Sequence, residues 1–104
     1  KKKLLILITA LSASVGYAAS FDCAKATTIN EKAICADSKL SQLDSDLSTA
    51  YKAVLSAAPE SADQIKSEQR QWVKGNKHCE SSPSPTACLI SAYQERISVL
   101  NVKP

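Results

Sequence analysis

Four cysteines are the residues best suited to chemistry in this sequence of 104 residues: Cys23, Cys35, Cys79 and Cys88. Cysteine can hold a metal, act as a redox thiol or close a disulfide. There is no Cys-x-x-Cys motif, and His78 is the sole histidine that could complete a zinc site. Because zinc and dithiol redox sites both need closely spaced ligands, we predict no metal, no cofactor and structural disulfides.

Four cysteines allow three disulfide connectivities. We favour Cys23 with Cys35 and Cys79 with Cys88, because each pair flanks one short segment that can double back. The alternative, Cys35 with Cys79, would join the first helix to the second, and the sequence leaves it open.

Acid–base and nucleophilic chemistry lack their usual arrangements. Asp44 and Asp46 form the most conspicuous carboxylate pair, but two residues apart on a helix they point to opposite sides. Glycoside hydrolysis needs two carboxyl groups that face one cleft. No serine lies in a Gly-x-Ser-x-Gly turn, and two glycines cannot build a phosphate loop. We therefore predict that the chain is not an enzyme.

The N-terminus has the pattern of an export signal. Three lysines (residues 1–3) precede an apolar run over residues 4–15, and small residues follow. This pattern predicts a cleaved secretory signal peptide, with the cut after Ala18 or after Ser20. The run is shorter than the roughly 20 residues that span a bilayer, so we expect no stable membrane anchor after cleavage.

The predicted organisation is a signal peptide over residues 1–20 and one helical domain over residues 21–104. An exported bacterial chain meets an oxidising compartment, where disulfides form. We therefore expect a periplasmic or extracellular protein.

The charge of the mature chain argues against nucleic acid as a partner. The whole chain has 13 Lys and Arg against 10 Asp and Glu, and three of those lysines lie in the leader. The mature chain is therefore neutral and lacks the clustered basic surface that phosphate binding requires. Residues 21–65 hold seven acidic and four basic residues, so an acidic first half could meet a basic protein partner.

Helix signals place these residues on at least three segments. Thr28 and Glu31 have the spacing of a capping box, and Asp37 offers a second N-cap after a break near Ala36. Apolar residues then recur at three- and four-residue intervals, which indicates a long helix. They are Leu40, Leu43, Leu47, Tyr51, Val54 and Leu55.

Proline and serine mark the later boundaries. Pro59 ends the first long helix and can open the next, whose apolar side includes Ile65 and Trp72. Ser84 and Pro85 suit the N-cap and first position of a third helix. Its apolar stripe comprises Leu89, Ile90, Tyr93, Ile97 and Leu100.

These segments predict an all-α fold. Each amphipathic helix needs a partner to bury its apolar face, and the connections between them are short. We predict a small antiparallel three-helix bundle with a short extra N-terminal helical turn, stapled by two disulfides. Trp72 and Tyr93 are assigned to its core, because their neighbours at helical spacing are apolar.

The mature chain resembles the LprI-like lysozyme inhibitor family. In the first half the resemblance lies in Phe21-Asp22-Cys23, Thr28, Glu31, Ile34-Cys35-Ala36-Asp37, Leu40, Leu43-Asp44, Leu47 and Tyr51. In the second half it lies in Gln69-Arg70, Trp72, Cys79, Ala87-Cys88-Leu89, Ala92-Tyr93 and Arg96-Ile97.

The resemblance implies a small helical envelope domain that binds a protein. It gives structural roles to Thr28, Glu31 and Arg70, as charged or capping residues of a small bundle. The family's namesake is lipid-anchored, whereas the residues before Cys23 do not form a lipobox.

The hypothesis from these observations is a secreted or periplasmic inhibitor of a basic, lysozyme-type cell-wall hydrolase. Acidic residues of the first half would steer the partner to its docking surface. They are Asp37, Asp44, Asp46, Glu60 and Asp63. The alternative is an envelope-binding, immunity or scaffold module that does not act on lysozyme.

Overall fold

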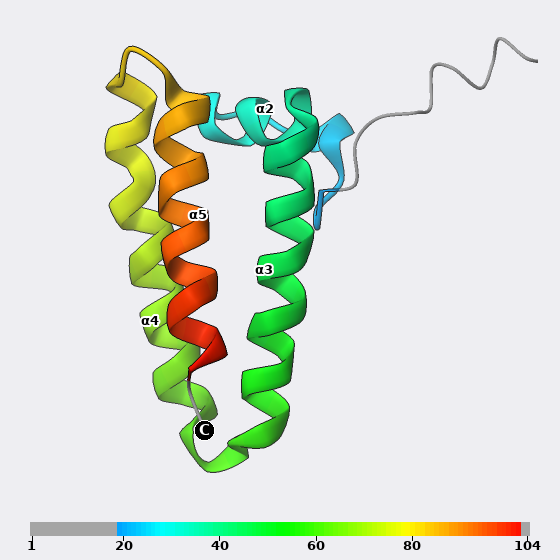
Figure 1. Cartoon of the computed structure of the whole chain (residues 1–104), viewed down its shortest axis with the longest axis vertical. Coiled ribbons are helices and arrows are strands. Elements are labelled where there is room, and N and C mark those ends of the chain that lie inside the picture. The colour runs from blue at the N-terminus through cyan, green and yellow to red at the C-terminus, as the bar shows by residue number, and fades with distance from the viewer. Residues whose placement is uncertain (1–18, 103–104) are drawn as a thin grey trace, which may run out of the picture.

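Four α-helices form the part of the chain that the computed structural model describes, residues 19–102. α3 (Ser38–Ala57), α4 (Ala62–Gly75) and α5 (Pro85–Asn101) lie side by side and alternate in direction, while the short α2 (Ile29–Ala36) crosses one end of the bundle (Figure 1). The predicted three-helix bundle with a short additional N-terminal helix is confirmed.

Three 3₁₀ turns connect and extend these helices. They are η1 (Cys23–Lys25), η2 (Pro59–Ser61) and η3 (Asn76–Ser81). A single residue, Ala58, separates α3 from η2, so the chain reverses direction sharply there. Such short connections make neighbouring helices antiparallel.

Local capping fixes the start of α2 and the boundary between α2 and α3. The amide of Glu31 donates to Thr28 Oγ1 over 3.0 Å, and the amide of Thr28 donates back to Glu31 Oε1 over 3.1 Å. α2 ends at Ala36, and Asp37 then accepts from the amide of Leu40 over 2.9 Å. The predicted capping box, break and second N-cap are all confirmed, because each depends on groups within a few residues.

The later boundaries also lie where the sequence puts them. α3 ends at Ala57, two residues before Pro59, and Pro59 opens η2. Ser84 caps α5 by accepting from the amide of Ala87 over 3.2 Å, with proline at the first helical position.

The core lies mainly between α3 and α5, which make the closest helix pair. Leu40 of α3 and Leu89 and Leu100 of α5 are almost fully buried. Among residues 19–102, α4 contributes one residue, Ile65, to the buried core, and Trp72 is partly buried against that core. α4 is therefore held in the bundle by less apolar burial than α3 and α5.

Both disulfides lie at the end of the bundle that α2 crosses. Cys23–Cys35 joins η1 to α2, and Cys79–Cys88 joins η3 to α5. This confirms the favoured local pairing, and the alternative of Cys35 with Cys79 is wrong. We call this region the disulfide end, and the opposite region around the α3–α4 turn the tip.

Candidate functional site

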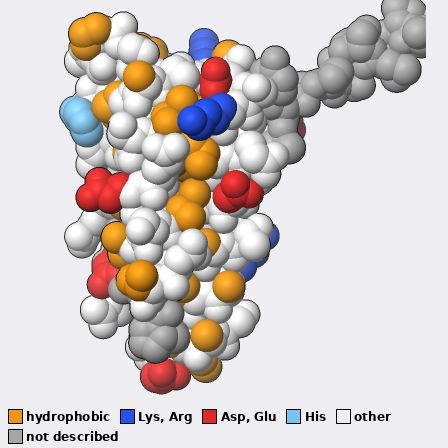
Figure 2. All heavy atoms as spheres, in the orientation of Figure 1, with side chains coloured by type: hydrophobic (Ala, Val, Ile, Leu, Met, Phe, Trp, Pro, Cys, Tyr) orange, Lys and Arg blue, Asp and Glu red, His pale blue; other side chains and the backbone are white. Residues whose placement is uncertain are grey.

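A groove of about 280 Å³ opens at the tip, between the end of α3 and the start of α4. Val54 and Ile65 give it an apolar floor, and Glu60, Gln64 and Glu68 add polar and acidic groups to its lining. Figure 2 shows acidic and hydrophobic side chains together at this end of the displayed face. The groove therefore combines apolar surface with a negative rim.

The local sequence explains why the tip is hollow. Ala57, Ala58 and Ser61 have small side chains, so the turn between the two helices leaves space above Val54. Pro59 cannot donate a backbone hydrogen bond, and α3 therefore stops instead of continuing across the gap. The backbone at the turn is held by the amide of Ala58, which donates to the carbonyl oxygen of Val54 over 3.0 Å.

Two of the five predicted partner-binding acids lie at the tip. Glu60 in η2 and Asp63 in the first turn of α4 are both exposed. A negative side chain in the first turn of a helix is stabilised by the positive end of the helix dipole. These two residues can hold negative charge in solvent without destabilising the fold.

The other exposed acid, Asp46, lies on α3 and accepts from Gln42 Nε2 over 3.0 Å. Asp37 is partly buried and is occupied as the N-cap of α3. Neither lines the groove at the tip. The predicted acidic half is therefore not one continuous surface, because its residues lie at the N-cap of α3, in the first half of α3 and at the tip.

Asp44 lies inside the bundle, where it cannot serve the surface role predicted for it. Its residue is 6% exposed, and its Oδ1 accepts from the hydroxyl of Tyr93 over 2.7 Å. Its Oδ2 accepts from the amide and the hydroxyl of Ser20, over 2.6 and 2.5 Å. A buried carboxylate needs such donors, because burial removes its hydration.

Tyr93 is buried in the core, as the sequence predicts. Burial, followed by the charge and hydrogen bond of Asp44, raises the pKa of its phenol well above the ordinary value. The Trp72 ring packs edge-on against it, with ring centres 5.0 Å apart. Trp72 thus links α4 to α5, consistent with the packing role assigned to it.

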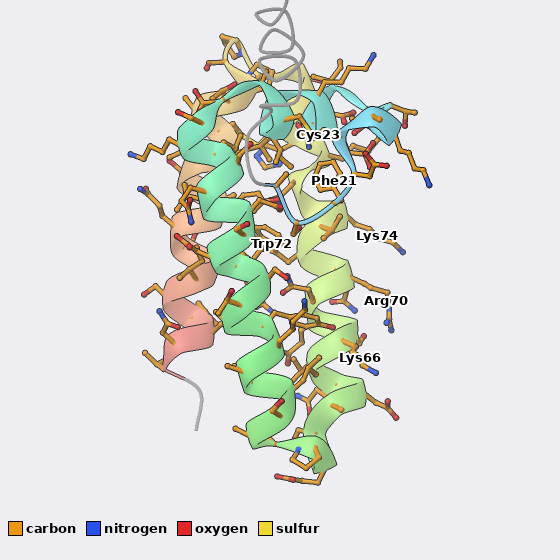
Figure 3. All side chains as sticks on the ribbon, turned by 90° about the vertical axis from the view of Figure 1, so that its right-hand side faces the viewer. Phe21, Cys23, Lys66, Arg70, Trp72 and Lys74 are labelled. Atoms are coloured by element: carbon orange, nitrogen blue, oxygen red, sulfur yellow. A yellow bond between two sulfur atoms is a disulfide. The ribbon has the colours of Figure 1, made fainter. Side chains whose placement is uncertain are left out.

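Arg70 is on the outer face of α4, where it is exposed, so the predicted structural role does not fit it (Figure 3). Arg96 of α5 is partly buried instead, and its Nε donates to Gln69 Oε1 over 2.8 Å. Its Nη2 is buried without a hydrogen-bond partner among the described residues. The spacing gives the reason: Arg96 lies three residues after Tyr93 and four before Leu100, on the buried stripe of α5.

A basic ridge on α4 is the feature that the sequence reasoning missed. Lys66, Arg70 and Lys74 recur every four residues, are all exposed, and project from the same side of the helix (Figure 3). The four-residue spacing was the available signal, because residues at that interval share one side of a helix. The bundle therefore carries a basic ridge as well as an acidic tip.

His78 lies against the second disulfide. Its Nε2 is 3.6 Å from Cys88 Sγ and 3.9 Å from Cys79 Sγ, and its Nδ1 is 2.7 Å from the carbonyl oxygen of Gly75. Among residues 19–102, these three side chains are the one group of potential metal ligands close enough together to share an ion. The two sulfurs are bonded to each other, whereas metal binding uses thiolates, so the oxidised arrangement is that of a structural bridge.

None of the helices within residues 19–102 is long and apolar enough to cross a membrane. The predicted signal peptide lies mostly in residues 1–18, outside the described residues.

Comparison with known proteins gives one family. The family described as "Lysozyme inhibitor LprI" matches residues 23–100. Proteins named "Lipoprotein LprI" from Mycobacterium bovis and Mycobacterium tuberculosis are 34% identical to this chain over 83 residues. The match covers 80% of this chain and 41% of each relative, so the chain spans about two fifths of the length of these relatives. No solved structure matches.

The relatives are named as lipoproteins, so the state of Cys23, the first cysteine of this chain, is relevant. Cys23 is bonded to Cys35, so its sulfur is not free to carry a lipid thioether in the oxidised domain. The family match spans both disulfides, the capping box of α2 and the core of α3 and α5. The chain belongs to the LprI lysozyme inhibitor family.

Proposed function

We propose that this chain is an exported inhibitor that binds a basic, lysozyme-type cell-wall hydrolase through the groove at its tip. The family supports lysozyme inhibition as the role. The observation that carries the choice of surface is the pairing of an apolar floor at Val54 and Ile65 with the exposed Glu60 in the lining. The exposed Asp63 adds a second negative charge in the first turn of α4, outside the lining.

The two parts of the groove would contribute differently to binding. Exposed acids attract a basic partner over a distance and raise the association rate, and salt screens this effect. Affinity comes mainly from a few buried contacts, which an apolar floor can make with an inserted side chain. A basic side chain with an aliphatic stem, such as lysine or arginine, fits this combination, because its stem packs on apolar surface while its charged head meets the rim.

The test is a turbidity assay in which lysozyme clears bacterial cell walls with and without the oxidised domain. Glu60→Lys places a positive charge on the rim, and we expect it to weaken inhibition roughly tenfold at low salt, which corresponds to about 1.4 kcal/mol. Raising the salt concentration should weaken inhibition by the unaltered domain and narrow the difference between the two proteins.

Glu95→Lys is the matched control. Glu95 is exposed on α5 and lines a different hollow, together with Gly75 and His78 near the disulfide end. It changes the net charge by the same amount, so it should leave inhibition close to that of the unaltered domain. Equal losses of inhibition from both substitutions would contradict docking at the tip. Clearing of the cell walls at the same rate with and without the unaltered domain would contradict the inhibitor role itself.

The basic ridge on α4 favours one further candidate function, the binding of an anionic envelope polymer. Lys66, Arg70 and Lys74 could follow the charges of such a polymer along the helix. Arg70→Glu should then abolish retention of the domain on isolated cell envelopes and leave lysozyme inhibition unchanged. Envelope retention that survives Arg70→Glu would contradict this candidate.

A further inference from the structure

The segment just before η1 is packed against the bundle. Ala19 and Phe21 are partly buried against the core, and Ser20 lies between them. Figure 3 shows Phe21 in the upper half of the molecule, near the disulfide end. Ser20 directs both its amide and its hydroxyl at one oxygen of Asp44, over 2.6 and 2.5 Å.

Ser20 supplies two of the three hydrogen bonds by which Asp44 is satisfied. The third comes from the hydroxyl of Tyr93 and reaches the other carboxylate oxygen. Asp44 is 6% exposed with Ser20 in place, whereas Ser20 itself is exposed at the surface. A buried charged group that loses its partners destabilises the fold, so the folded domain depends on keeping Ser20.

The sequence alone allows two cleavage positions for the predicted signal peptide. Gly16 and Ala18 are the small residues that suit a cut after Ala18, and Ala18 and Ser20 are those that suit a cut after Ser20. The first cut leaves Ala19 and Ser20 on the mature chain. The second cut removes them both, and Asp44 keeps a single donor.

We propose that the exported chain is cleaved between Ala18 and Ala19, so that Ser20 stays on the mature protein as the partner of the buried Asp44. The new α-amino group is then that of Ala19, the residue before Ser20, whose amide and hydroxyl bind the Asp44 carboxylate. It is cationic at neutral pH, and its charge is opposite to that of Asp44. The proposal rests on the export assumed in the proposed function, and it is independent of lysozyme inhibition.

Intact mass measurement on protein recovered from the periplasm of cells that express the full chain tests the cut directly. The expected mass is that of residues 19–104 with two disulfides. A mass smaller by one alanine and one serine residue would place the cut after Ser20 and overturn the proposal, and a mass that retains the leader would overturn it as well. Inhibition is assayed separately on the purified domain, so failure of the inhibitor role and failure of this cleavage are distinguishable.

Thermal unfolding tests the physical reason. We expect residues 21–104 to melt roughly 5 to 15 °C below residues 19–104, because two hydrogen bonds to a buried charged group are lost. Ser20→Ala in the longer form removes the hydroxyl hydrogen bond and should lower the melting temperature by a smaller amount. Ser20→Thr keeps a hydroxyl and should leave the melting temperature close to that of the unaltered longer form. Ser56→Ala, an exposed serine of α3, is the control and should leave the melting temperature nearly unchanged.

The coupling to Asp44 makes the test specific. Asp44→Asn should lower the melting temperature more in residues 19–104 than in residues 21–104, because Ser20 is present in only the longer form. Equal melting temperatures for the two forms, or equal effects of Asp44→Asn in both, would show that Ser20 does not stabilise the domain and would remove the basis for the proposed cut.

Discussion

The two ends of the bundle are built by different means. At the disulfide end, two covalent bridges are joined by polar contacts between α2 and η3: Asn30 Nδ2 donates to the carbonyl oxygen of Asn76 over 2.9 Å, and the amide of Asn30 donates to Glu80 over 3.2 Å. At the tip, neither η2 nor α4 has a side-chain cap, and backbone hydrogen bonds of Ala58 and Ser61 close the turn.

The difference separates the cross-linked end of this small domain from the end that we propose for recognition. A core of this size buries limited apolar area, so cross-links supply a large share of its stability. They are concentrated at one end, where α2 and η3 are short and cannot bury much surface by themselves. The tip has no cross-link, and part of its apolar surface lines an open groove.

Removing a disulfide should give the largest effect and should rank the two bridges. Cys79 is fully buried, so we expect Cys79→Ser with Cys88→Ser to lower the free energy of unfolding by about 2 to 5 kcal/mol. Cys23 and Cys35 are both partly exposed, and their double replacement should cost less. Urea unfolding of the two variants measures the difference, and a larger loss from the Cys23–Cys35 pair would reverse the ranking.

The polar core between the two ends should give the next largest effect. Tyr93→Phe removes one donor to the buried Asp44 and should lower the free energy of unfolding by roughly 1 to 3 kcal/mol. Because the pKa of Tyr93 is raised in the folded state, the phenol stays protonated there while the unfolded chain ionises above its ordinary pKa of about 10. Stability should therefore fall as the pH rises above about 10.

That alkaline decrease should be smaller in Tyr93→Phe, because the variant has no phenol to titrate at this position. Tyr51→Phe is the control, since Tyr51 is only half-buried on α3. Urea unfolding between pH 8 and pH 11 gives the comparison. Parallel pH profiles for the unaltered domain and Tyr93→Phe would contradict the assignment.

The capping box at the disulfide end should give the smallest effect. Hydrogen bonds from the backbone amides of Thr27 and Thr28 lower the pKa of Glu31. A lowered pKa in the folded state means that its contribution to stability is present above the ordinary pKa and is lost as the pH falls through the folded value. Glu31→Gln should therefore melt slightly lower at neutral pH and show a shallower loss of stability in acid.

The matched control for that prediction is Glu95→Gln, because Glu95 is exposed on α5. It should leave the acid limb of the unaltered domain in place. An acid limb that is unchanged in Glu31→Gln would show that the capping box does not depend on the charge of Glu31.

Features that depend on near neighbours follow directly from the amino-acid sequence. Thr28 and Glu31 predict the start of α2, and Asp37 predicts the start of α3. Pro59 and Ser84 predict the later boundaries. Each of these residues acts on backbone groups only a few residues away. The two disulfides were predicted for the same reason, since each closes a short segment. Family membership followed from the spacing of these signals with the aromatic core residues.

The partners of the polar side chains that point inward come only from the packed structure. Asp44 lies four residues after Leu40 and three before Leu47, and Arg96 lies three residues after Tyr93 and four before Leu100. That spacing turns both toward the core, but their hydrogen-bond partners come from other segments: Ser20 and Tyr93 donate to Asp44, and Gln69 accepts from Arg96. The groove at the tip arises in the same way, because only the packed bundle brings the end of α3 beside the start of α4. A sequence pattern specifies a face of a helix, whereas the partners on that face exist only after the helices have packed.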